Sequence, residues 1–203
     1  MGVMQFFSAL SEPDEPEEPI WSAPPWLQPP SGEIPTPLAL SRILSRRPAT
    51  AVSLRRVDVY SNGCSFRIQV DARRERGMDR DRWEDIIEAF EPHRRRNRER
   101  NSGLRLGVTL SDGRTATADR VWQMELGSEE DPNGPIVRLN DRGGGGSSHE
   151  YTTSFQAWLW PLPPSGPLKL HYQWNALGID ESEVEFDAAA IVDAAADVTP
   201  IWE

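Results

Sequence analysis

Three segments of this 203-residue chain alternate apolar and polar residues without a break. Residues 64–71, 104–110 and 168–174 each place an apolar side chain at every second position, and the positions between are polar or, at Gly107, glycine. The spacing matches a β-strand with one face buried and the other exposed to water. We therefore expect a mainly β fold in which Phe66 and Ile68 point into the core.

A fourth segment contains one irregularity. Its apolar residues alternate except at Arg55 and Arg56, where one extra residue restores the inward phase, as in a β-bulge; they are Val52, Leu54, Val57 and Val59. Turn sequences at 61–63 and 111–114 indicate hairpins. Shorter strands fit 38–44, 114–122, 136–140, 151–160 and 182–186. These strands and turns predict an antiparallel β-sandwich, immunoglobulin-like or jelly-roll-like, with one or two short helices.

Two helices are expected beside the strands. Asp79 is placed to cap a helix whose apolar residues share one face, namely Trp83, Ile86, Ile87 and Phe90. This helix falls within a charged insertion near residues 74–100. Asp187 is placed to cap a second helix near residues 187–197, whose apolar stripe is Ile191, Val192 and Ala195.

Residues 1–34 differ in composition from the rest of the chain. They contain no Lys or Arg, and prolines disfavour helices and inner strands there. We predict an acidic, proline-rich arm that is largely extended or disordered, followed by a single domain over residues 35–203. Apolar residues in the arm, such as Trp21 and Trp26, would either pin it to the domain or anchor a partner.

Charge and composition exclude several classes of function. The net charge of −10 disfavours nucleic acid and anionic lipid as partners. Cys64 is the only cysteine, so the chain has no internal disulfide and no cysteine-based zinc site. No apolar stretch approaches the roughly 18 to 20 residues that span a bilayer, and no signal-peptide pattern is present. We expect a cytoplasmic protein without a membrane segment, metal or cofactor.

One local cluster departs from the acidic balance. Residues 93–100 include Arg94, Arg95 and Arg96, which could bind phosphates or an acidic partner, or could form an exposed solubilising loop. The glycine run 143–146 is not followed by the lysine that a phosphate-binding loop requires. We interpret it as a flexible or tightly bent connection.

Tryptophan is abundant, with eight residues in the chain. Alternation over residues 155–160 sends Phe155, Ala157 and Leu159 to one face and Trp158 and Trp160 to the other. A strand that is apolar on both faces needs cover on both sides. We predict that the C-terminal helix covers the tryptophans; the alternative is an exposed aromatic platform for a ligand or a subunit.

Residues 158–168 read Trp-Leu-Trp-Pro-Leu-Pro-Pro-Ser-Gly-Pro-Leu, and Gln173-Trp174 and Gly178-Ile179 follow. This run resembles a motif of an actinobacterial family of uncharacterised proteins. The family's Leu-x-x-Gly-Val-x-x-x-Asp-Gly-Arg strand and turn is similar to residues 104–114, and its acidic strand, alanine-rich helix and final tryptophan are similar to 187–196 and Trp202. The resemblance covers residues 35–203; it implies one domain and no particular activity.

No catalytic motif is present in the sequence. We therefore expect a non-enzymatic binding or structural protein that acts through its tryptophan-rich face, at Trp158 and Trp160, or through its proline-rich arm. Its partner would be another protein or a second copy of the chain. Two alternatives remain: an enzyme whose site is assembled from scattered strand-end residues, and binding of nucleic acid or an acidic partner through the Arg94–Arg100 cluster.

Overall fold

Antiparallel strands account for most of the described residues, which are 23–90, 103–118 and 132–202 of the computed structural model. The larger sheet contains β2 (Thr36–Leu38), β3 (Arg42–Arg46), β4 (Thr50–Tyr60), β5 (Gly63–Arg73), β9 (Glu150–Trp160) and β8 (Ile136–Gly146). The smaller sheet contains β11 (Ile179–Asp187), β10 (Pro167–Trp174), β6 (Arg105–Thr109) and β7 (Thr115–Ala118). β1 (Glu33–Ile34) and β12 (Thr199–Pro200) form a separate ribbon.

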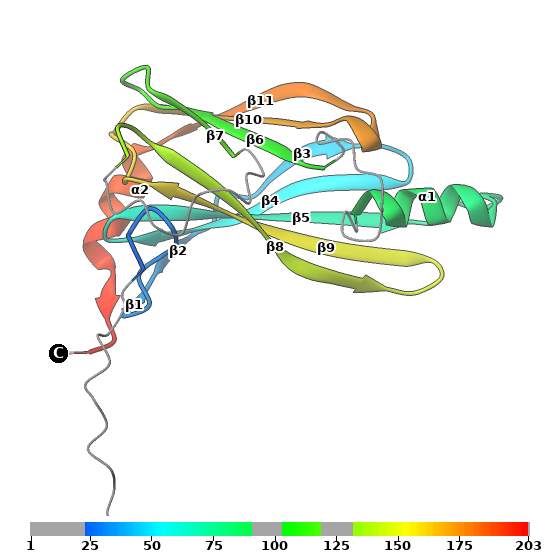
Figure 1. Ribbon diagram of the computed structural model, residues 1–203, viewed down its shortest axis with the longest axis horizontal. Coiled ribbons are helices and arrows are strands. Elements are labelled where there is room, and N and C mark those ends of the chain that lie inside the picture. The colour runs from blue at the N-terminus through cyan, green and yellow to red at the C-terminus, as the bar shows by residue number, and fades with distance from the viewer. Residues whose placement is uncertain (1–22, 91–102, 119–131, 203) are drawn as a thin grey trace, which may run out of the picture.

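The two sheets are stacked, with β6, β7, β10 and β11 on one side and β4, β5, β8 and β9 on the other (Figure 1). Phe66 and Ile68 are each 1% exposed and belong to the core cluster, as the alternation predicted. Leu170 of the smaller sheet is also in this cluster. Tyr172 ties the layers together because its hydroxyl donates a hydrogen bond to the Leu44 carbonyl. The predicted antiparallel β-sandwich is confirmed.

The predicted bulge and hairpins are also present. The register of β4 against β5 shifts between Leu54 and Arg56, where the sequence placed the extra residue. β4 and β5 are joined by the turn at 61–62, and β6 and β7 by the turn at 111–114. Local sequence signals therefore set the pairing of these neighbouring strands.

Helix α1 (Arg80–Phe90) lies at one end of the sandwich (Figure 1). The Asp79 carboxylate accepts a hydrogen bond of 2.7 Å from the Arg82 N–H, as an N-cap does. Phe90 stacks on Tyr151 and packs edge-on against Trp174, which anchors the helix to both sheets. The predicted insertion near 74–100 extends beyond α1, but residues 91–100 lie outside the described part of the chain.

Helix α2 (Ala189–Ala194) follows β11 and continues into the short helix η2 (Ala195–Asp197). The Asp187 carboxylate accepts a hydrogen bond of 2.9 Å from the Ala189 N–H. Ile191 is 0% exposed in the core. A third short helix, η1 (Asn175–Leu177), links β10 to β11. Within the described residues, no helix combines the length and apolarity needed to cross a membrane.

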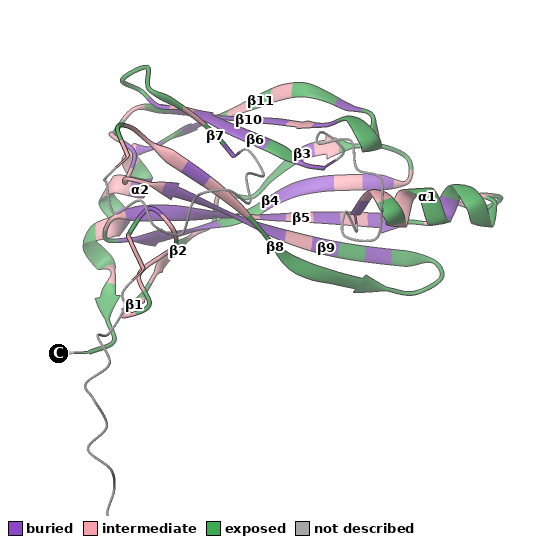
Figure 2. Ribbon diagram, in the orientation of Figure 1, coloured by how far each residue is buried: buried purple, intermediate pink, exposed green. Residues whose placement is uncertain are grey.

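The glycine run is a strand and not the connection that we predicted. Gly144, Gly145 and Gly146 pair with residues 151–153 of β9, after a register shift that follows Asp141. A Cβ at Gly144 would lie 2.6 Å from the Thr152 carbonyl oxygen, so the missing side chain permits this close approach. The turn is formed instead by residues 147–149, and this end of the hairpin is exposed (Figure 2).

Part of the predicted arm is packed onto the domain. Residues 23–34 are described, and Trp26 among them is 5% exposed. Glu33 and Ile34 form β1. Of the two roles that the sequence left open for Trp26, the structure shows the first, in which it pins this segment to the domain. Residues 1–22 lie outside the described part of the chain.

Core truncation tests this packing. Phe66→Ala should lower the free energy of unfolding by about 3 to 5 kcal/mol, because it removes a ring that is 1% exposed. Ile43→Ala is the control, since Ile43 is 55% exposed and its truncation should cost within about 0.5 kcal/mol. Urea unfolding followed by circular dichroism measures both. Equal losses in the two variants would contradict the inward phase of β5.

Candidate functional site

Trp158 lies on the outer face of the larger sheet, away from the smaller sheet. Phe155, Ala157 and Leu159 belong to the core cluster, so alternation along β9 sends Trp158 to the opposite face. Trp158 is nevertheless 0% exposed. β9 is therefore covered on both faces.

Residues from the N-terminal segment and from the β4–β5 hairpin cover Trp158. Tyr60 packs edge-on against the indole, with ring centroids 5.6 Å apart. The absence of a side chain at Gly63 leaves room for the indole ring, since a Cβ at this position would lie only 2.5 Å from the indole carbon Cη2. The indole Nε1–H donates a hydrogen bond of 3.0 Å to the Pro25 carbonyl. The side chain thus has apolar cover and an acceptor for its only polar group.

Trp26 covers the second tryptophan, Trp160, with ring centroids 5.7 Å apart. The predicted cover by the C-terminal helix is wrong for Trp158, since Ile191 of that helix is in the core cluster and Trp158 is not. Helix α2 follows β11 and packs Ile191 against the core. Residues 25–26 instead lie on the outer face, against Trp158 and Trp160. Trp158 is therefore no exposed platform, and Trp160 is half-buried.

Further along the same face, a polar cluster surrounds Asp58. The Asp58 side chain is 4% exposed and accepts hydrogen bonds from Arg56 Nε at 2.8 Å and Arg67 Nε at 2.6 Å. Arg67 also donates to Gln156 Oε1 at 2.9 Å, and Gln156 Nε2 donates to the Ser65 hydroxyl at 2.8 Å. A carboxylate can be buried here because charged donors satisfy its oxygens.

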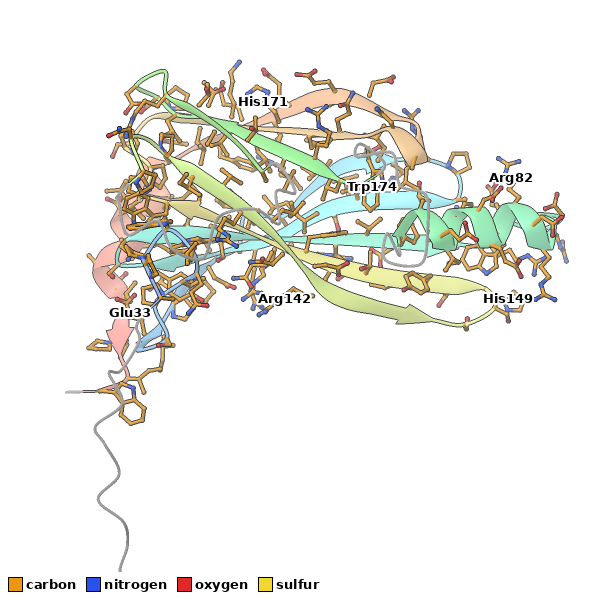
Figure 3. All side chains as sticks on the ribbon, viewed as in Figure 1. Glu33, Arg82, Arg142, His149, His171 and Trp174 are labelled. Carbon is orange, nitrogen blue, oxygen red and sulfur yellow. The ribbon has the colours of Figure 1, made fainter. Side chains whose placement is uncertain are left out.

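Two more arginines lie on this face. Arg138 is the cross-strand partner of Trp158. Arg142 follows Asp141 at the register shift of β8, and its charge acts on the Tyr60 phenol together with that of Arg67. Burial raises the pKa of Tyr60, nearby Asp58 raises it further, and the two arginines oppose this. We call Arg56, Arg67, Arg138 and Arg142 the arginine face; Figure 3 shows Arg142 and Glu33 along one side of the molecule.

The large apolar side chains that are exposed gather mainly at the β1–β12 ribbon. Among the described residues they are Ile34, Ile43, Ile201 and Trp202. Ile34 pairs with Thr199, and the Ile201 N–H donates to the Gly32 carbonyl, so Ile34 and Ile201 share a face of the ribbon. The Trp202 ring lies beside Gly32. We call Ile34, Ile201 and Trp202 the terminal patch.

A shallow hollow of about 100 Å³ lies on the outer face of the smaller sheet, beside His171 and Gly107. Thr109 Oγ1 is 2.9 Å from His171 Nε2, and Glu183 Oε2 is 3.6 Å from His171 Nδ1. This order of hydroxyl, imidazole and carboxylate is that of an activated nucleophile. However, β6 is paired on both sides, so its backbone N–H groups are engaged in ladders and cannot stabilise an oxyanion. We interpret the cluster as cross-strand polar pairs.

The remaining candidates from the sequence carry no site in the described residues. Arg94, Arg95 and Arg96 lie outside them, so binding through that cluster stays a prediction. Cys64 is buried, and burial raises the pKa of its thiol, which disfavours the reactive thiolate. Residues 23–90, 103–118 and 132–202 contain no group of three or more His, Cys, Asp or Glu that could hold a metal ion.

The fold and its outer surfaces thus define an antiparallel β-sandwich with a covered tryptophan face, an arginine face and an exposed terminal patch. Comparisons with models of protein families, with curated proteins and with solved structures found no match. The alternation in residues 64–71 predicts that Arg67 points outward. No local sequence pattern predicts that Ile34, Ile201 and Trp202 are exposed, because their exposure depends on the pairing of β1 with β12.

Removing Trp26 tests whether the N-terminal segment is part of the fold. Trp26→Ala should lower the free energy of unfolding by about 3 to 5 kcal/mol, because the ring is 5% exposed and covers Trp160. Trp202→Ala is the matched control and should cost within about 0.5 kcal/mol, since Trp202 is 77% exposed. Urea titration monitored by far-ultraviolet circular dichroism compares them. A stability of Trp26→Ala equal to that of the unmodified protein would refute the packing role.

Proposed function

We propose that this protein is a non-enzymatic binding module whose terminal patch contacts a partner protein. The proposal rests on the exposure of three large apolar side chains at the β1–β12 ribbon. Trp202 is 77%, Ile34 is 56% and Ile201 is 44% exposed. Tryptophan is enriched among the residues that dominate binding energy at protein interfaces. Covering apolar surface contributes roughly 25 cal/mol per Å², which favours a partner at such a patch.

Charge favours a different protein over a second copy of the chain. The chain carries a net charge of −10, and the exposed Asp197 of η2 lies just before β12 of the patch. A contact between two identical patches would bring together two chains of the same net negative charge, each with an Asp197 carboxylate beside the patch, and like charges across an interface oppose binding. A partner with an apolar centre and a basic rim fits this patch.

The family resemblance and the cellular location remain predictions beside this proposal. The similarity of residues 158–168 to the actinobacterial family supports one domain and suggests no activity. We propose a cytoplasmic location, and we expect the partner there.

Site-specific photocrosslinking in cells that express the full chain tests the proposal. The photoreactive residue p-benzoylphenylalanine replaces Ile34 or Ile201, or Ile43 as a control that is 55% exposed but lies on β3. We expect the same discrete adduct from positions 34 and 201 and none from position 43. Adding Trp202→Ser should remove the adduct, because it deletes the centre of the patch without disturbing the core.

Two results would count against this function. Equal adducts from all three positions would mean that crosslinking reports exposure alone. An adduct whose mass is that of two copies of this chain would replace the partner protein by self-association, which light scattering of the purified protein would then confirm.

A further inference from the structure

The arginine face carries more positive charge than its surroundings neutralise. Arg56 and Arg67 share the Asp58 carboxylate, and Glu33, the other acidic residue that acts on Tyr60, is bound to the N–H and hydroxyl of Ser61. Among the described residues, the guanidinium groups of Arg138 and Arg142 have no hydrogen-bond or ion-pair partner. A local excess of guanidinium groups stands out in a chain whose net charge is −10.

The chain enters the fold at this same face. The Pro25 carbonyl accepts the hydrogen bond of Trp158, and Trp26 packs on Trp160. Because Trp158 pairs across strands with Arg138, Pro25 lies beside the arginine face.

The sequence of that preceding segment is complementary to the face. Residues 12–18 contain five carboxylates, and residues 1–34 contain no Lys or Arg; the five are Glu12, Asp14, Glu15, Glu17 and Glu18. Guanidinium and carboxylate groups form short, charge-assisted and often bidentate hydrogen bonds. Pro13, Pro16 and Pro19 disfavour a helix in this sequence, which suits an extended peptide that presents several carboxylates.

The distances allow the contact. An extended chain spans about 3.3 Å per residue, so Glu18 can lie up to about 23 Å from Pro25, and Glu15 up to about 33 Å. Along β9, the distance from Trp158 to the row of Gln156 and Arg67 is about 7 Å, because two strand residues separate them. The acidic segment can therefore reach all of the arginine face.

We propose that the acidic segment 12–18 of this chain binds the arginine face of its own domain. The covalent connection gives the segment an effective concentration on the order of millimolar, so it occupies the face unless another acidic ligand displaces it. The contact weakens with added salt, since exposed ion pairs are screened. This inference does not rest on the terminal patch.

Disulfide trapping in the full-length protein tests the contact. Glu17→Cys is combined with Arg142→Cys on the arginine face or with the control Asp180→Cys on β11 of the smaller sheet, both of which are exposed positions. Cys64 can stay in place because it is buried. We expect the intramolecular disulfide between positions 17 and 142 to form about tenfold faster or more than that between 17 and 180.

The advantage should disappear in 1 M NaCl, on the order of the ionic strength at which the Debye length falls to about 3 Å. It should also disappear when Glu12, Asp14, Glu15 and Glu18 are replaced by Lys, which reverses the charge of the segment. Equal rates for the two cysteine pairs would overturn the proposal. So would a rate advantage that persists in high salt and after charge reversal, or a product that is mainly an intermolecular dimer.

Discussion

Packing of the two inner sheet faces against each other is the interaction on which the rest of the structure depends. Phe66 of β5, Phe155 of β9 and Leu170 of β10 are each at most 1% exposed, and they fix which way their strands face. Since side chains alternate along a strand, every residue next to a core residue is assigned to the outer face. The chemistry of the outer faces is thus a direct consequence of the core.

The outer face of the larger sheet is stabilised in two different ways. Near the end of β9, apolar rings are covered by Trp26 and Tyr60. Further along, Asp58 of β4, Arg67 of β5 and Gln156 of β9 form hydrogen bonds across three adjacent strands. Removing Arg67 would leave the nearly buried Asp58 carboxylate with only Arg56 as a charged donor, and a buried carboxylate without enough donors is destabilising. This network therefore disfavours any other register of the three strands.

Features set by neighbouring residues could be predicted from the sequence. The bulge at Arg55–Arg56, the hairpins and the hydrogen bonds of the Asp79 and Asp187 carboxylates at the starts of α1 and α2 each depend on a few consecutive residues. The cover of Trp158 could not be predicted, because Pro25 lies 133 residues away in the chain. The extension of β8 also escaped prediction, since glycines have no side chains to alternate. Strand order and the terminal patch likewise depend on pairing between distant segments.

The N-terminal segment 23–34 lies between the two proposed binding surfaces. Trp26 holds it beside the arginine face, and Ile34 is part of the terminal patch. A ligand at one surface could influence the other only if it favoured a state in which this segment moves. Releasing Trp26 would expose its own ring and uncover Trp160, which costs several kcal/mol, about as much as truncating a buried aromatic residue. The two surfaces are therefore expected to bind independently, one through apolar contact and the other through charge.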